Sequence, residues 1–316
     1  MQGGNSQPPG HRWLRLAPLR DASARAVQTV RRCFGWLLPV VDLLLPPRCA
    51  FCGSDLPEDG RDTALLSSSR AQSLSQDAES PPLFLCQPCM AALTVWTGPL
   101  PCPRCGAAAP SVRPAEGITA AGSPADTPES TCEPIWLSCP ECARGKFRFE
   151  QLCHLGAYQG DLRNAVLRCK HPQHGYLAAT LAELLWQRQG QQLAAFAPQL
   201  VVPIPMHWRQ RAWRGANAPE TIAARLAARL NLPMHLTLRR ARATKPQHHL
   251  GRAARQTNVR RAFRLRPGYH CQGARVLVVD DVVTTGATVN AAAKVLLAAG
   301  AQAVAVAALA RADGPR

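Results

Sequence analysis

Residues 279–288, Val-Asp-Asp-Val-Val-Thr-Thr-Gly-Ala-Thr, constrain the fold more than any other part of the chain. They follow a short apolar run at 275–278 and precede a helical stretch at 289–297. An apolar run that ends in two acids is typical of the carboxyl end of a buried parallel strand. Small hydroxylated residues and a glycine ahead of a helix let backbone N–H groups converge on an anion. We therefore predict a phosphate site beside an acid pair that suits a polyol or a metal. The alternative is a solvated strand end followed by an ordinary turn.

The rest of the second half alternates strand and helix patterns. Strands are predicted at 154–158, 200–205, 275–281 and 303–309, with helices at 161–168, 176–189, 219–230 and 289–298. Alternation of this kind predicts a parallel α/β sheet flanked by helices. Because ligands bind at the carboxyl edge of such sheets, residues 203–208 and 280–288 are expected at the site.

Charge and hydropathy limit the partners and the compartment. The net charge is +17, and residues 201–272 hold fifteen Lys or Arg residues against one acid, Glu220. This excess favours polyanions, either pyrophosphate substrates or nucleic acid, although 33 of the 37 basic residues are Arg and codon bias is an equal explanation. No apolar run is long enough for a transmembrane helix, so we predict a cytoplasmic protein. Residues 34–45 are expected to form an amphipathic helix, with a membrane-surface helix as the alternative.

Eight of the thirteen cysteines form four Cys-x-x-Cys pairs, and the last two pairs repeat the first two at a distance of 53 residues. Two such pairs supply the four thiolates of a tetrahedral structural zinc site. Sequential pairing predicts two Zn²⁺ ions in a double zinc ribbon. A disulfide framework is disfavoured in a cytosolic chain, and a redox motif does not come four times. The predicted ligands are Cys49, Cys52, Cys86, Cys89, Cys102, Cys105, Cys139 and Cys142. The isolated cysteines, expected to be packing residues, are Cys33, Cys132, Cys153, Cys169 and Cys271.

The 279–288 segment resembles the 5-phosphoribosyl-1-pyrophosphate (PRPP) signature of type I phosphoribosyltransferases. That signature has four apolar residues, two acids, an apolar pair and Thr-[Ser/Thr/Gly]-Gly-[Ala/Thr]-[Ser/Thr], and this chain matches it throughout. The resemblance implies that Asp280 and Asp281 are the catalytic acids that hold the ribose hydroxyls of PRPP, which binds with Mg²⁺. It also implies a loop for the 5′-phosphate formed by Thr284, Thr285, Gly286, Ala287 and Thr288.

Further blocks resemble the ComF (competence protein F, GntX-like) family over about residues 42–311. They are Asp-Leu-Leu-Leu-Pro-Pro-Arg-Cys at 42–49, Tyr-Gln-Gly at 158–160, Val-Pro-Ile-Pro at 202–205, and a series at 244–263. One block departs from the family, because its usual Phe and Gln are replaced by Ala216 and Ala218. The resemblance implies three parts: a basic extension at 1–41, a double zinc ribbon at 42–145 with low-complexity insertions, and a phosphoribosyltransferase-like domain at 146–316.

The activity implied is transfer of a phosphoribosyl group from PRPP to a nitrogen acceptor, linked to DNA uptake and use in competence. The alternative is a non-catalytic, PRPP-sensing accessory factor. Single-stranded DNA and proteins of the competence machinery are the other expected partners. Residues 239–258 are the candidate mobile cover of the site. The candidate pyrophosphate site comprises Pro203, Ile204, Pro205, Met206 and His207, with Lys170 and Lys245.

Overall fold

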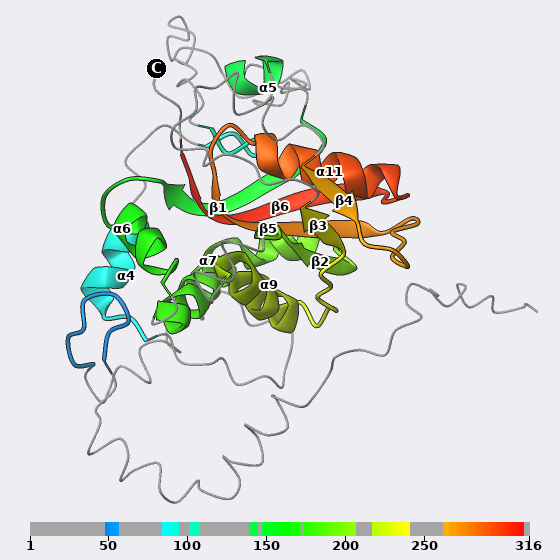
Figure 1. The fold of residues 1–316 in the computed structure, drawn as a ribbon. Coiled ribbons are helices and arrows are strands. Elements are labelled where there is room, and N and C mark those ends of the chain that lie inside the picture. Colours follow the sequence, from blue (N-terminus) through cyan, green and yellow to red (C-terminus); the bar gives the residue numbers. More distant parts are fainter. Residues whose placement is uncertain are drawn as a thin grey trace, which may run out of the picture.

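The computed structural model describes residues 48–56, 84–94, 101–107, 139–144, 147–171, 174–206, 217–240 and 262–312. Within them a four-stranded parallel sheet has the order β1-β6-β5-β2. The strands are β1 (Gln151–Ala157), β2 (Leu200–Pro203), β5 (Arg275–Val283) and β6 (Ala303–Arg311). Helices lie on both faces of this sheet (Figure 1). The predicted parallel α/β sheet is therefore confirmed.

The two central strands are buried on both faces because their side chains are apolar at almost every position. Between residues 303 and 309 of β6 the odd-numbered side chains, such as Ala305 and Ala307, join one hydrophobic core, and the even-numbered ones, such as Val304 and Val306, join the other. Helices α7 (Gly175–Ala195) and α9 (Ala218–Arg229) cover the first face. Helix α11 (Ala287–Ala298) and the antiparallel pair β3 (Leu238–Arg240) and β4 (Phe263–Leu265) cover the second (Figure 1). The small alanines of β6 let both layers approach the sheet closely.

Several element bounds differ from the sequence-based prediction. Strand β1 begins earlier, because Gln151 already pairs with Ala305. Strand β2 ends at Pro203 rather than at 205, and β5 continues past the acid pair to Val283, which pairs with Arg311 at the end of the longer β6. Helix α7 continues beyond 189 to Ala195, and α11 begins two residues earlier, at Ala287. In β1, β5 and β6, pairing with residues far along the chain outweighs the local signal.

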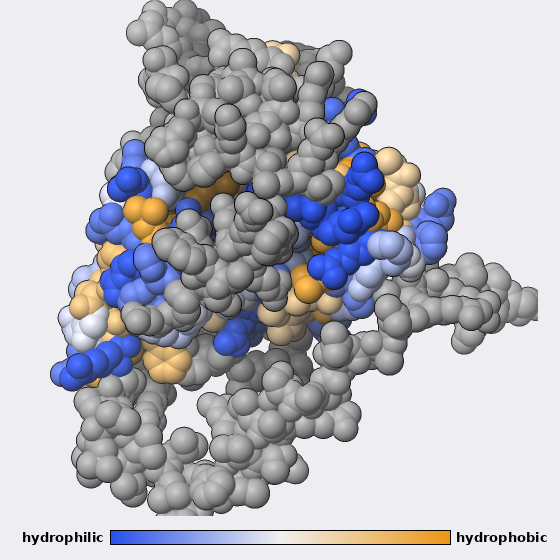
Figure 2. Space-filling model, in the orientation of Figure 1, coloured by the Kyte–Doolittle hydropathy of each residue, from blue (hydrophilic) through white to orange (hydrophobic). Residues whose placement is uncertain are grey.

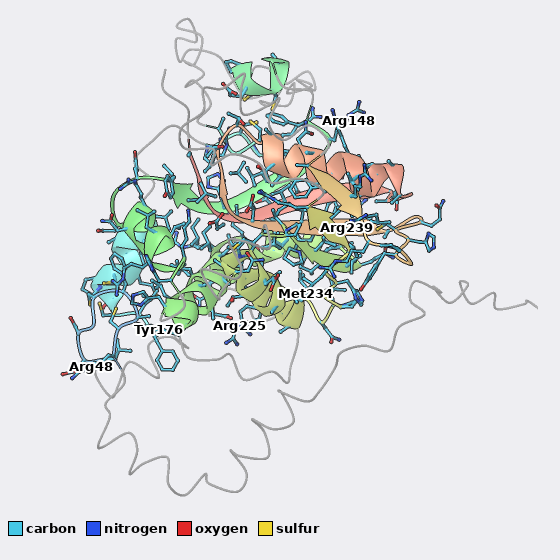
Figure 3. The ribbon with its side chains drawn as sticks, viewed as in Figure 1. Arg48, Arg148, Tyr176, Arg225, Met234 and Arg239 are labelled. Atoms are coloured by element: carbon cyan, nitrogen blue, oxygen red, sulfur yellow. The ribbon has the colours of Figure 1, made fainter. Side chains whose placement is uncertain are left out.

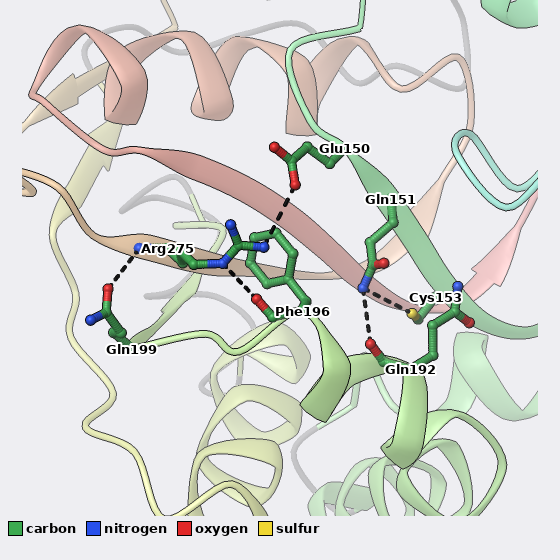
Figure 4. A network of polar contacts seen from close by, with 7 residues as sticks. All are labelled: Glu150, Gln151, Cys153, Gln192, Phe196, Gln199 and Arg275. Carbon is green, nitrogen blue, oxygen red and sulfur yellow. Dashed lines mark hydrogen bonds and ion pairs between the residues drawn. The ribbon is translucent and has the colours of Figure 1, made fainter.

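A polar network fastens the amino ends of the strands to the end of α7 (Figure 4). Arg275 donates from Nε to the Phe196 carbonyl at 2.7 Å, and its guanidinium lies 4.3 Å from the centre of the Phe196 ring. Its Nη2 lies 3.7 Å from Oε2 of Glu150, and its backbone N–H donates to Gln199 Oε1 at 3.1 Å. The end of the sheet away from the predicted site is thus held rigid.

Both cysteine units dock on the sheet domain rather than forming a separate body. Helix α4 (Gln87–Thr94) packs on α6 (Gly160–Arg168) and β1, and its Leu93 is buried in the same core as α7. Helix α5 (Pro140–Arg144) belongs to the second unit. Figure 1 shows α4 beside α6 and α5 on the other side of the sheet, above α11. No helix of the described segments is long and apolar enough to cross a membrane.

Candidate anion site and cysteine clusters

The turn between β5 and α11 forms a loop at the start of a helix. Gly286 is the N-cap of α11 with φ +73°, in the left-handed region that favours glycine. No acidic residue stands in the first turn of α11, so its dipole is left free to attract an external anion. The five residues expected to hold the phosphate, listed next, are contiguous at this helix start: Thr284, Thr285, Gly286, Ala287 and Thr288. Their arrangement suits an anion such as a phosphate monoester.

The acid pair precedes this loop directly and is held by its own backbone. Asp280 is only 7% exposed, and its Oδ1 accepts the backbone N–H of Asp281 at 2.9 Å. Burial raises the pKa of Asp280 well above its usual range, the charge of Asp281 raises it further, and Arg240 opposes both. The ionised form of Asp280 is therefore destabilised in the free protein. A ligand hydroxyl that donates a hydrogen bond to this carboxylate stabilises the ionised form.

Two cations lie beside the pair. Lys170, which follows α6, places its Nζ 3.6 Å from Oδ2 of Asp281. Arg240, at the end of β3, is mostly buried; burial lowers the pKa of its guanidinium, and attraction to Asp280 opposes this. Sequence reasoning missed Arg240 as an individual residue, because it is one of many arginines in its segment. Only the pairing of β3 with β4 turns it inward.

The predicted pyrophosphate loop leaves the sheet next to the acid pair. Pro203 pairs in register with Val279, and the backbone N–H of Ile204 donates to the Val279 carbonyl at 2.8 Å. Pro205 and Met206 continue from there. The structure therefore brings this loop and Asp280 to the same edge, at the ends of neighbouring strands. His207 and Lys245 lie outside the described residues, as does most of the predicted cover at 239–258.

The eight paired cysteines gather into two groups of four, in the predicted sequential pairing. They are Cys49, Cys52, Cys86 and Cys89, and then Cys102, Cys105, Cys139 and Cys142. In each group the four sulfurs lie within 4.8 Å of one another.

The sulfur spacing decides between a metal site and disulfides. The Sγ atoms of Cys105 and Cys139 are 3.6 Å apart, and those of Cys102 and Cys142 are 3.7 Å apart. A disulfide requires about 2.05 Å, whereas a tetrahedron with Zn–S bonds of about 2.3 Å has sulfurs about 3.8 Å apart. All the described cysteines are free thiols. Both groups therefore fit a tetrahedral metal ion.

Thiol acidity in these clusters is consistent with a metal role. Burial raises the pKa of Cys89 and Cys105, and raises that of Cys142 to about 12. Without a cation these thiols stay protonated, so metal binding must release protons. Of the isolated cysteines, Cys153 and Cys169 are buried, as is the third described one, Cys271. This agrees with packing roles, while Cys33 and Cys132 lie outside the described residues.

Comparison with known proteins matches this architecture. Residues 218–316 match the phosphoribosyl transferase domain family. The chain is 36% identical to the DNA utilization protein YhgH of Salmonella typhimurium over 179 residues, which cover 54% of this chain and 76% of that protein. It is 33% identical to YhgH of Escherichia coli over the same shares, and 30% identical to competence protein F of Haemophilus influenzae, over 55% of this chain and 78% of that protein. A solved structure of the allosteric regulatory enzyme of purine biosynthesis covers 35% of this chain and 22% of its own at 24% identity and a TM-score of 0.25, which is too low to argue from.

The sheet, the loop at the start of α11 and the family match define a phosphoribosyltransferase-type domain preceded by two four-cysteine clusters. Within that class, the family is identified by sequence identity of 30–36% over about three quarters of the length of several relatives. The chain belongs to the ComF family, whose relatives include YhgH and competence protein F.

Proposed function

We propose that the protein binds PRPP at the carboxyl edge of the sheet and transfers its phosphoribosyl group to a nitrogen acceptor. The observation that carries the proposal is the acid pair Asp280 and Asp281, followed immediately by a Gly286-centred loop at the start of α11. A helix start suits the 5′-phosphate, and two carboxylates suit the ribose hydroxyls.

The reaction requires no protein nucleophile. The acceptor nitrogen forms a bond to C1 of the ribose while the C1–O bond to pyrophosphate breaks, and pyrophosphate leaves with the electron pair. The acceptor nitrogen then loses its proton. Mg²⁺ bound together with PRPP would supply positive charge to offset the negative charge that develops on the pyrophosphate. The protein orients the ribose through Asp280 and Asp281 and excludes water, and the cations Lys170 and Arg240 offset the charge of the acids.

Calorimetry tests the binding half of this proposal. PRPP with Mg²⁺ should bind the wild-type protein, and Gly286→Val or the double variant Asp280→Ala with Asp281→Ala should abolish binding while the sheet stays folded by circular dichroism. Unchanged PRPP affinity in the double variant would refute the assignment of the acid pair. Pyrophosphate release with a panel of purine and pyrimidine bases then separates an enzyme from a PRPP sensor.

A second candidate function is a single-stranded-DNA-binding accessory factor of transformation. It is favoured by the hairpin β3–β4, where Arg239 and Arg264 are exposed cross-strand partners and Arg266 follows, also exposed. Like charges directly opposite each other in a hairpin are unfavourable without a counter-anion. Figure 2 shows strongly hydrophilic surface in the region of this hairpin. A role in handling DNA also agrees with the similarity to the DNA utilization protein YhgH.

We also propose Zn²⁺ as the ion of both clusters, because all-thiolate tetrahedral sites select zinc over harder cations. In this proposal the metal is structural, since no ligand position is left open by four cysteines. The proposed organisation is a basic extension at 1–41, a metal-binding part at 42–145 and the transferase part at 146–316, in a cytoplasmic protein.

A further inference from the structure

Phe147 lies between the second cysteine cluster and the phosphate loop. It packs against the cluster formed by Cys102, Cys105, Cys139 and Cys142, and its carbonyl accepts from Arg104 Nη2 at 3.4 Å. On its other side, a Cβ added at Gly286 would lie 2.9 Å from Phe147 Cε1. The ring also packs on the buried Phe149, with centroids 5.0 Å apart and the ring planes tilted by 34°. The Phe147 side chain therefore contacts both the second cysteine cluster and Gly286, the N-cap of α11.

Arg148 and Arg311 also lie between the second cysteine cluster and the phosphate loop. The backbone N–H of Arg148 donates to Oδ1 of Asn290, in the first turn of α11, at 2.6 Å, and Arg148 lies above that helix in Figure 3. Arg311, at the end of β6 and only 3% exposed, donates from Nε to the Cys105 carbonyl at 3.0 Å. Its Nη1 donates to the carbonyl of Val283, the residue before the loop, at 3.3 Å. Arg311 thus links the second cluster to the start of the loop, and the segment of Phe147 and Arg148 links it to the first turn of α11.

The first cluster docks elsewhere. The carbonyl of Phe51 accepts from Arg168 Nη1 at the end of α6, and the Arg168 guanidinium lies 5.6 Å from the Phe51 ring centre. Arg188 of α7 donates to Thr94 of α4 at 2.7 Å. In Figure 3, Arg48, which directly precedes Cys49 of this cluster, and Arg148 are labelled on opposite sides of the view. The two clusters, although duplicated in sequence, therefore support different parts of the domain.

We infer that the second cysteine cluster holds the phosphate loop in its anion-binding shape, with Phe147, Arg148 and Arg311 as positioning residues. Metal bound by the second cluster keeps the backbone around its four cysteines folded. That backbone positions the Phe147 ring and the Arg311 guanidinium. These two side chains in turn hold the backbone from Val283 to Asn290. Metal occupancy of the second cluster and anion affinity of the loop are then linked, and each strengthens the other. The inference rests on the proposed function, because the anion at the loop is the phosphate of PRPP.

The test is a double-mutant cycle on the full chain. Phe147→Ala should keep both zinc ions, yet weaken PRPP binding by about fivefold or more, the lower end of typical coupling between sites. Cys139→Ser with Cys142→Ser should lose one zinc and weaken PRPP binding at least as much. Combining the two changes should add little, since both act through the same contact. Phe147→Leu, which keeps an apolar side chain of similar reach, should recover most of the affinity.

The matched controls use the first cluster. Phe51→Ala removes an aromatic ring beside that cluster, and Cys86→Ser with Cys89→Ser removes its metal; both should leave PRPP affinity within about twofold of wild type. Equal weakening by the first-cluster and second-cluster variants, or full additivity in the cycle, would overturn the inference.

Amide hydrogen exchange gives a readout that does not need PRPP. Residues 284–290 should exchange faster in Phe147→Ala and in the second-cluster variant, while the strands stay protected. If wild-type protein binds no PRPP but residues 284–290 still exchange faster in the two variants, the proposed function fails and the coupling between cluster and loop stands. If loop exchange is unchanged in both variants, the coupling fails even where PRPP binds.

Discussion

Replacing Gly286 by alanine should weaken PRPP binding far more than it destabilises the fold. The residue has φ +73°, where a Cβ costs about 1–2 kcal/mol. The new Cβ would also lie 2.9 Å from Phe147 Cε1, so the ring or the loop must shift. If the loop relaxes in the free protein, PRPP binding must restore its shape against this strain. A strain of about 2 kcal/mol then raises the Kd about 30-fold.

The matched control is Gly268→Ala. Gly268 has φ +82° and no atom within 4 Å of an added Cβ, and it lies before the amino end of β5. Gly268→Ala therefore carries the same backbone strain as Gly286→Ala, but it lacks the contact with Phe147 and lies at the opposite end of β5 from the phosphate loop. Thermal unfolding should show a similar loss of stability for the two variants, while calorimetry shows weaker PRPP binding only for Gly286→Ala. Equal PRPP affinities for the two variants would refute the argument.

The remaining predictions concern protonation, metal and DNA. Because burial raises the folded-state pKa of Asp280, stability of the ligand-free protein should fall as pH rises from about 4 through that folded pKa. Asp280→Asn should remove this dependence and add about 0.5–2 kcal/mol at neutral pH in urea unfolding, and an unchanged profile would contradict the burial argument. Purified protein should hold two zinc ions with sulfur-only coordination by X-ray absorption, and Cys86→Ser should cost one; protein without zinc would exclude the metal assignment. Single-stranded DNA should bind with a steep salt dependence in fluorescence anisotropy, and replacing Arg209, Arg211 and Arg214 by alanine should reduce the slope by about 0.7 per lost phosphate contact. A flat titration near physiological salt would exclude direct DNA binding.

The parts of this protein that sequence could predict are those whose signals are local or repeated. The order of strand, acid pair, glycine loop and helix at 275–298 is contained in one short segment, and the structure has β5 and α11 in that order. The 53-residue repeat of the cysteine pairs made sequential pairing the simplest prediction, and the two sulfur groups follow it. The first prediction succeeds because its signal is local, and the second because the repeat shows which cysteine pairs belong to one unit.

Other features depend on residues that are far apart in the chain. Lys170 was predicted as part of the pyrophosphate site, and only the folded structure shows that its ion-pair partner is Asp281, 111 residues away in the chain. Arg240 is separated from Asp280 by 40 residues and turns inward only because β3 pairs with β4. No local pattern marks such residues, because charged side chains in a basic segment look alike until the layers pack.

Patterns in the sequence are enough to predict the parallel sheet, the loop that begins α11 and the grouping of eight cysteines into two sites. The position of the second site against the loop emerges only from the folded chain, through the contact of Phe147 with Gly286 and the bridge of Arg311 between Cys105 and Val283. Arg311 and Cys105 are 206 residues apart. Periodicity and spacing report on the neighbours of a residue along the chain, whereas contacts of this kind arise only when the layers close around a shared core.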